Sequence, residues 1–151
     1  MFVKKILPLL AMLALLVLAG SPAFAQKKPA AKAPAKASTA GRALLKGKSV
    51  YTQYCLSCHQ ADGGGVDGLN PPLGKTDYVL GDKPRLIKVL LNGLQGVDIN
   101  GEEYHNVMPA QDQLSDQQIA DVLTYVRNNF GNKASAITAA EVKTVRAAGK
   151  K

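Results

Sequence analysis

The chain has 151 residues and a formal net charge of +8, a length that suits one domain. Its basic excess lies outside the central part, because residues 43–132 contain seven bases and ten acids, whereas residues 26–42 and 133–151 are both basic. A nucleic-acid-binding domain would carry a basic face on the fold itself, so this distribution argues against nucleic acid as a partner.

The N-terminal segment 1–25 has the layout of a secretory signal peptide. Lys4 and Lys5 precede an apolar run of 14 residues that extends from residue 6 to residue 19, and small residues stand at positions 23 and 25. We therefore predict cleavage after Ala25 and export to the periplasm. The alternative is an uncleaved membrane anchor, but a bilayer span needs about 20 apolar residues, more than this run supplies.

The segment 26–42 is rich in Lys, Ala and Pro and shows no apolar periodicity. Such a composition predicts a solvated, flexible linker, so the folded domain is expected to begin near residue 43. The last segment, 133–151, is predicted to be a basic tail in which Thr138 and Glu141 could cap a short exposed helix. The basic segments serve solubility and spacing, or else contact with an anionic membrane surface or an acidic complex.

The first predicted helix of the folded part covers residues 43–55 and leads into the motif Cys55-Leu56-Ser57-Cys58-His59. Cys-x-x-Cys-His is the attachment motif for c-type haem. Two thiols three residues apart can reach both vinyl groups of one porphyrin, and the next residue then places an imidazole under the iron. We interpret Cys55 and Cys58 as covalent attachment sites for one haem c and His59 as an iron ligand.

Three other uses of these residues remain open at this point. A disulfide redox centre uses the same cysteine spacing, although usually where a strand enters a helix. A structural zinc ion needs four ligands and would require Cys55, Cys58, His59 and His105, two of which are adjacent in the chain. A plain disulfide between Cys55 and Cys58 would be strained at this separation.

The next elements are a loop, a helix and a hairpin. Residues 61–74 contain five Gly and two Pro, which predicts a loop. A second helix is expected to begin after Asp82 as N-cap, with Pro84 in its first turn, and to end at Gly93. Asn100-Gly101 between two short extended pieces then predicts a tight β-hairpin.

The third helix of the folded part has the clearest signals. Ser115 and Gln118 form a capping box at its start. Apolar residues then repeat at helical spacing as far as Phe130, and Gly131 is the predicted stop. The apolar residues in this pattern are Ile119, Val122, Leu123, Val126 and Phe130.

Met108 is the candidate for the second axial ligand of a haem. It is the only Met outside the predicted signal peptide, and Pro109, which follows it, would stiffen the loop that presents it. The alternatives are His105, an open iron site, or a Lys ligand; a Met can also simply fill a core gap. With both axial positions filled by His59 and Met108, oxygen chemistry at the iron is disfavoured, which favours an electron carrier over an enzyme.

Taken together, the residues from Leu44 to Asn132 resemble class I monohaem cytochromes c. The residues that carry the resemblance are the Cys-x-x-Cys-His motif, Pro71-Pro72-Leu73, Met108-Pro109 and the final helix 114–132. The resemblance implies an all-α fold of three to four helices wrapped around one covalent haem, with a short hairpin before the methionine loop. It also implies that Pro71 accepts a hydrogen bond from the proximal imidazole, and that Gly47 and Tyr51 lie where the first helix crosses the last, near Tyr125.

The function implied by this resemblance is single-electron transfer in the periplasm, as a shuttle or as a cytochrome subunit of a respiratory or dehydrogenase complex. No catalytic residue is assigned. The expected partners are larger redox proteins, such as a dehydrogenase, a nitrite reductase or a terminal oxidase. Two other classes stay as alternatives: a haem enzyme or ligand-binding protein with a displaceable Met108, and a non-haem module that holds zinc or a disulfide.

Overall fold

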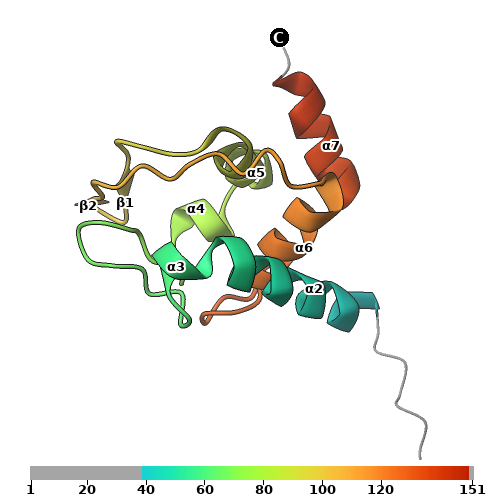
Figure 1. The fold of residues 1–151 in the computed structure, drawn as a ribbon, viewed down its shortest axis with the longest axis horizontal. Helices are drawn as coiled ribbons and strands as arrows, with labels where there is room; N and C mark the ends of the chain where they lie inside the picture. Colours follow the sequence, from blue (N-terminus) through green and yellow to red (C-terminus); the bar gives the residue numbers. More distant parts are fainter. Residues whose placement is uncertain (1–38, 150–151) are drawn as a thin grey trace, which may run out of the picture. The chain divides into compact units, whose positions relative to one another are not determined.

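The computed structural model describes residues 39–149, and the regular secondary structure of this part is helical apart from one short hairpin (Figure 1). The elements are α2 (Thr39–Tyr54), α3 (Leu56–His59), α4 (Asp77–Leu80), α5 (Lys83–Asn92), β1 (Asp98–Ile99), β2 (Glu102–Glu103), α6 (Asp116–Val126) and α7 (Ala139–Ala148). The all-α prediction is confirmed, and the described part has more than four helices because two of them, α3 and α4, are single turns. Within it, none of the helices is long and apolar enough to cross a membrane.

The predicted signal peptide, its cleavage after Ala25 and nearly all of the linker 26–42 lie outside the described residues. The first helix, α2, begins at Thr39, four residues before the predicted start at Ala43. The linker composition therefore marked the start of the folded part only approximately, because alanine and lysine are also good helix formers.

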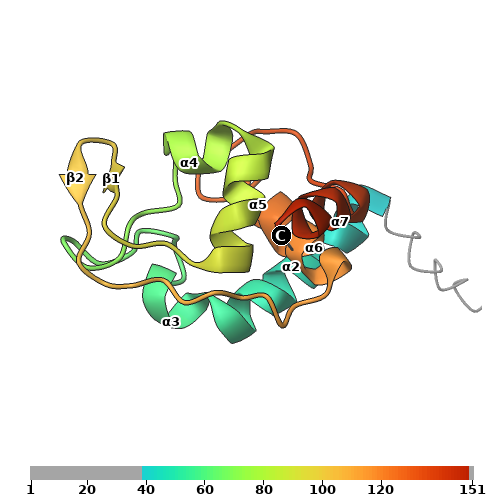
Figure 2. The ribbon, with the colours of Figure 1, turned by 90° about the horizontal axis from the view of Figure 1, so that it is seen from above.

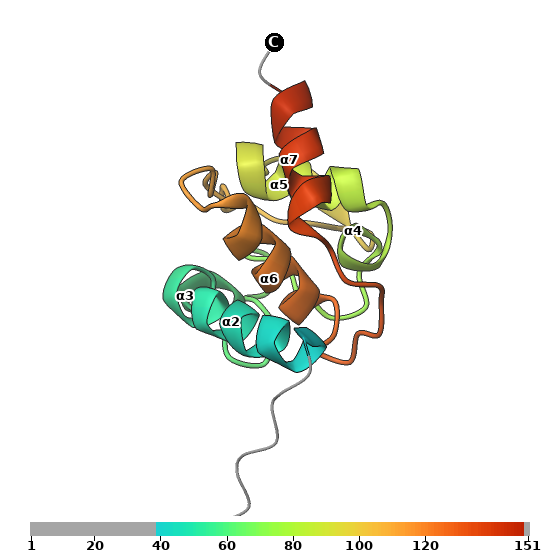
Figure 3. The same cartoon turned by 90° about the vertical axis from the view of Figure 1, so that its right-hand side faces the viewer.

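Helices α2 and α6 cross at close range, and this contact organises the core (Figure 3). Gly47 is buried at the crossing; a Cβ atom built on it would lie 2.1 Å from the backbone oxygen of Asp121 and 2.6 Å from Cβ of Tyr125. The buried ring of Tyr51 packs next to it, with its centroid 5.5 Å from that of Tyr125. The crossing expected at Gly47 and Tyr51 is confirmed.

Replacing Gly47 by Ala is expected to destabilise the protein by about 3 kcal/mol or more, because its methyl group would displace a backbone carbonyl rather than a flexible side chain. At an exposed helix position the same change would stabilise by about 1 kcal/mol through helix propensity, so the sign of the effect is diagnostic. Urea unfolding followed by circular dichroism measures it. Ser49→Ala, an exposed position of the same helix, is the control and should shift the unfolding free energy by less than about 0.5 kcal/mol.

Helix α5 follows the prediction at both ends. The Asp82 side chain accepts a hydrogen bond from the backbone N–H of Arg85, and Gly93 with φ of 79° is the C-cap. This glycine is required, because a Cβ atom there would lie 2.5 Å from the backbone oxygen of Met108. The apolar face of α5 is buried and consists of Leu86, Ile87, Val89 and Leu90.

The third predicted helix, α6, begins as predicted but ends four residues early. Its Ser115–Gln118 capping box is present. The helix ends at Val126, however, and Phe130 has φ of 56°, outside the helical region. The apolar spacing to Phe130 was therefore misleading. Side-chain amides satisfy the last carbonyls of the helix instead. The amides of Asn128 and Asn129 donate to carbonyls one turn earlier, and the amide of Asn132 donates to the Val126 carbonyl.

The predicted hairpin is present at one end of the described part (Figures 1 and 2). Asp98 pairs with Glu103 and Ile99 with Glu102 in antiparallel register. The two turn residues, Asn100 and Gly101, both have positive φ, as a type I′ turn requires. The hairpin leads the chain back to the Met108 loop.

The helix expected in the basic tail is present as α7, with the predicted capping box of Thr138 and Glu141. The expectation that it would be exposed is wrong, because Val142 is fully buried and Ile137 is only 4 % exposed. Helix α7 packs against α5 and α6 (Figures 2 and 3). Val142 is the one buried residue within the helix, and a single buried aliphatic residue among Ala and Lys does not show an apolar face in the sequence.

Arg127 is a buried cation that holds this C-terminal segment to the rest of the fold. Its guanidinium donates to the backbone oxygens of Val79 and Gly81 at the end of α4, and at 2.9 Å to that of Ser135. Burial lowers the pKa of Arg127 from its usual value, with the charge of Glu141 opposing the shift. Carbonyl groups at the end of α4 thus supply the negative partner for the charge.

Candidate functional site

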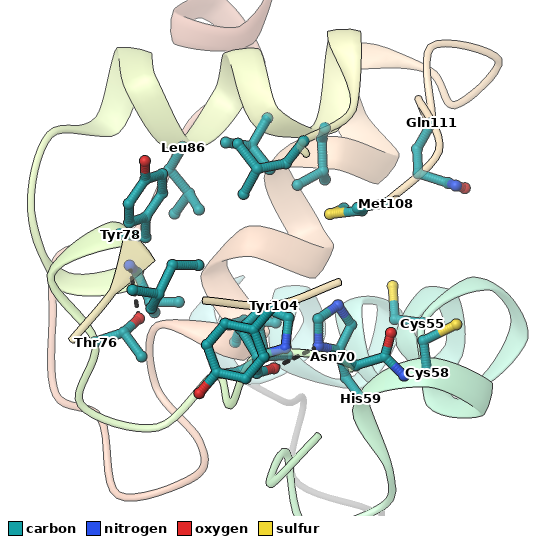
Figure 4. Close-up of a pocket in the computed structure, with 18 of the residues that line it drawn as sticks. Cys55, Cys58, His59, Asn70, Thr76, Tyr78, Leu86, Tyr104, Met108 and Gln111 are labelled. Atoms are coloured by element: carbon teal, nitrogen blue, oxygen red, sulfur yellow. Dashed lines mark hydrogen bonds between the residues drawn. The ribbon is translucent and has the colours of Figure 1, made fainter. Parts of the chain in front are cut away.

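A mostly apolar cavity lies between α2–α3 on one side and α5 with the Met108 loop on the other (Figure 4). With its open mouth it holds about 1250 Å³ of space free of protein atoms. Part of this space is open to solvent, and the rest is bounded mainly by apolar side chains, as in sites that bind apolar ligands. The apolar lining includes Leu73, Val79, Leu86, Val89, Leu90, Leu94, Val97, Ile99, Leu114, Val122, Leu123 and Val126.

His59 enters this cavity from α3 and is oriented by its ring nitrogen Nδ1. This nitrogen lies 3.0 Å from the backbone oxygen of Pro71. A carbonyl can only accept, so Nδ1 carries the proton and donates, which leaves Nε2 as the unprotonated nitrogen. Burial lowers the pKa of His59, with the Pro71 hydrogen bond opposing the shift. The imidazole is therefore neutral at pH 7 and has the lone pair that a metal ligand needs.

Cys55 and Cys58 lie on the same wall as His59 and both line the cavity (Figure 4). Both are free thiols, Cys55 half-buried and Cys58 exposed. Burial, and secondarily the charge of Cys58, raises the pKa of the Cys55 thiol to about 11. A redox-active dithiol needs a lowered pKa at its attacking cysteine, so the environment of Cys55 does not suit that role.

Met108 faces His59 from the opposite wall of the cavity (Figure 4). An isolated antiparallel bridge fixes its backbone: Met108 N–H donates to the Leu94 oxygen at 2.9 Å, and Leu94 N–H donates to the Met108 oxygen at 3.0 Å. Three residues further on, Gln111 N–H donates to the Leu90 oxygen at 2.6 Å. The thioether is thus presented by a loop that rests on the end of α5.

His105, the alternative ligand, lies elsewhere. It is exposed, does not line the cavity, and its backbone N–H donates to the Gly68 oxygen at 3.1 Å. The structure brings together Cys55, Cys58, His59, Pro71 and Met108 and leaves His105 outside. In the described part of the chain no group of three or more His, Cys, Asp or Glu side chains could hold a metal ion by itself, which disfavours the zinc alternative.

This set of groups fits a covalently attached haem. One wall offers two thiols and an imidazole nitrogen, the other wall offers a thioether, and the space between them is apolar. Imidazole and thioether are the two axial ligands found in electron-transfer cytochromes. The Pro71 hydrogen bond fixes the imidazole ring, as ligating histidines require.

Several lining residues were missed by the sequence reasoning, and among them are Tyr78 and Val79 of the one-turn helix α4 and Thr76 just before it. Thr76 is its N-cap, 1 % exposed, and its side chain accepts from the Val79 N–H at 3.2 Å. Tyr78 lines the cavity beneath Arg85, whose guanidinium carbon lies 4.3 Å from the ring centroid. A Thr before an Asp signals an N-cap, but a helix of four residues leaves no periodicity to detect.

The comparisons with known proteins agree with this geometry. The sequence model of the family described as Cytochrome c matches residues 44–130. Cytochrome c-552 of Thermus thermophilus is 40% identical over 115 residues, which cover 70% of this chain and 77% of that protein.

Two further relatives are components of larger enzymes. The cytochrome c subunit of the quinone alcohol dehydrogenase of Gluconacetobacter polyoxogenes is 37% identical over 110 residues, which cover 71% of this chain and 24% of that subunit. The Cbb3-type cytochrome c oxidase subunit CcoP of Azospirillum sp. (strain B510) is 38% identical over 106 residues, or 65% of this chain and 32% of that subunit. The chain thus spans about a quarter to a third of these two subunits.

Proposed function

Because the chain belongs to the cytochrome c family, whose members carry single electrons on covalently bound haem c, we propose that it is an exported carrier of this kind. Its proposed place is the periplasm, after removal of the signal peptide 1–25. It serves there as a shuttle or as a cytochrome subunit, and it turns over no substrate of its own. The single observation that carries this proposal is the opposition of His59 and Met108 across one apolar cavity.

In the proposed site, Cys55 and Cys58 would hold the haem by thioether bonds, and His59 and Met108 would be the ligands of its iron. The haem iron supplies the exchange between Fe(II) and Fe(III). Features of the protein shift the balance between these two states in opposite directions. The thioether ligand and the apolar lining favour the reduced, less charged form, whereas the Pro71 carbonyl makes the imidazole a better donor to the oxidised form.

Electrons are proposed to enter and leave where residues that line the cavity are exposed at the surface. Cys58 is exposed, and in the Met108 loop Val107 is 62 % exposed. Ser57 is exposed next to Cys58. This uncovered region offers a partner a short path to the haem. It suits a small and transient interface with a larger redox protein, such as a dehydrogenase, a nitrite reductase or a terminal oxidase.

The test is purification of the mature protein from cells that have a working c-type haem attachment system. We expect one haem per chain by the pyridine haemochrome spectrum, a reversible one-electron reduction, and a sulfur-to-iron charge-transfer band in the oxidised form. A colourless protein would contradict the whole proposal. A high-spin ferrous protein that binds CO at neutral pH would support the ligand-binding alternative instead.

A further inference from the structure

The C-terminal helix α7 contacts the segment that follows Met108 through Arg146, which lies 30 to 34 residues further along the chain than its partners. The Arg146 guanidinium donates from all three of its nitrogens to this segment. Nε donates to the Asp116 carboxylate at 2.7 Å, Nη1 to the Asp112 backbone oxygen at 2.9 Å, and Nη2 to the Leu114 backbone oxygen at 2.7 Å. One side chain therefore fixes three points of the turn between the Met108 loop and α6.

These bonds are partly shielded from water, because the side chains of Arg146 and Asp116 are 24% and 30% exposed. Hydrogen bonds from a guanidinium are stronger than neutral ones, and more so where water is partly excluded. Leu114, at the centre of the turn, is 3% exposed and lines the cavity. The turn that Arg146 holds is thus itself part of the cavity wall.

The Met108 loop has little other support on its outer side. Val107, Pro109 and Ala110 are exposed. Between residues 107 and 111 the loop's backbone bonds to other segments are those to Leu94 and Leu90 at the end of α5. Just before them, the backbone N–H groups of residues 105 and 106 donate to the oxygens of residues 68 and 69. The loop is therefore held before Met108 by residues 68 and 69, at Met108 and Gln111 by the end of α5, and after Gln111 by the turn at 112–116. If the turn moves outward, the last of these supports is lost and the loop is held only at and before Gln111.

Helix α7 is attached to the core by contacts that do not involve Arg146. Val142 is fully buried between α7 and its neighbours, and Lys83 on α5 lies 2.9 Å from the Glu141 carboxylate. The same Lys83 ammonium donates to the Ala136 oxygen at 2.6 Å. Arg146 thus joins the turn to a helix whose position is already fixed.

We propose that Arg146 is a positioning residue for Met108: by tying residues 112–116 to α7 it keeps the thioether in the cavity and lowers the population of an open form of the loop. No described residue of α7 lines the cavity, so the effect passes through the loop and not through contact with the haem. This inference rests on the proposed role of Met108 as a haem ligand.

The test is titration of the oxidised holoprotein with imidazole, followed by loss of the sulfur-to-iron charge-transfer band. Imidazole binds the iron only in the fraction of molecules whose Met108 has left, so its apparent dissociation constant falls as the open fraction rises. Arg146→Gln is expected to lower that constant roughly three- to thirtyfold. Arg146→Lys, which keeps the charge without the forked donors, is expected to lie between Arg146→Gln and the wild type.

Lys143→Gln is the matched control, because it removes one positive charge from an exposed position of the same helix and should leave the imidazole affinity unchanged. A purely structural role for Arg146 would lower the melting temperature without changing imidazole affinity in the folded protein. Equal affinity in wild type and Arg146→Gln would therefore refute the inference while leaving Met108 ligation intact. Absence of the band from the wild type would refute the ligand assignment itself.

If Arg146→Gln does not accumulate as holoprotein, the proposal is tested with Asp116→Asn instead. This variant removes the anionic partner and leaves the two carbonyl partners of Arg146 in place. We expect tighter imidazole binding than in the wild type, by a smaller factor than for Arg146→Gln. An unchanged dissociation constant in Asp116→Asn would overturn the proposal.

Discussion

Replacing Met108 by Ala is expected to abolish the sulfur-to-iron charge-transfer band of the oxidised protein and to lower its reduction potential by on the order of 100 mV or more. The thioether is a weak donor that favours the reduced iron, and axial ligands set haem potentials over a span of about 0.8 V. Absorbance spectroscopy and a redox titration measure the two effects. Alanine leaves the cavity wall without a donor at this point, so the ferrous protein should also bind CO.

His105→Ala is the matched control for this prediction, since His105 is the other candidate ligand and the structure places it outside the cavity. Its charge-transfer band and reduction potential should equal those of the wild type. The ligand assignment is wrong if the band survives in Met108→Ala. A band that disappears in His105→Ala would instead show that the loop geometry around Met108 depends on the outer side chain.

The double replacement of Cys55 and Cys58 by Ala is expected to remove covalent haem completely. Both thiols line the cavity on the His59 wall, and no other cysteine exists in the chain. The measurement is haem staining of the protein after separation under denaturing conditions, where only thioether-bound haem stays with the polypeptide. Without the haem, the apolar lining of the cavity would face water, so the variant should also unfold at a lower temperature. Far-ultraviolet circular dichroism measures this melting temperature.

Single replacements refine this prediction. Cys58→Ala should retain haem through Cys55 alone, with a red-shifted reduced spectrum because one vinyl group stays unsaturated. Gln53→Ala, an exposed position in the helix that precedes the motif, should bind and retain haem as the wild type does. Persistent haem staining in the double variant would contradict the assigned attachment sites.

The chemistry of the site could be predicted from the sequence because it depends on local spacing. The Cys-x-x-Cys-His motif lies within one turn of chain, so its geometry is largely fixed by the backbone. The same holds for helix caps such as Asp82 and Ser115 and for the Asn100-Gly101 turn, all of which the structure confirms. In each of these cases the deciding interaction joins residues at most four positions apart.

The end of α6 and the position of α7 could not be predicted in this way. Phe130 continues an apolar spacing, yet the chain leaves the helix before it because Asn132 reaches back to the Val126 carbonyl and also donates to the Leu73 carbonyl. Likewise, α7 has few apolar residues, and its attachment depends on Val142 and on the ion pair between Lys83 and Glu141. Propensity and periodicity carry no information about such distant partners.

By itself, then, the sequence determined the haem-binding chemistry, the helical class and the order of the main elements, because these follow from residue types at short and fixed separations. The tertiary structure alone decided that Met108 and not His105 faces His59. It also decided that Arg146 in the C-terminal helix contacts the turn at 112–116, which follows the Met108 loop. Both of these depend on bringing residues tens of positions apart into contact. Such contacts are chosen by the packing of the whole core, and no local pattern encodes them.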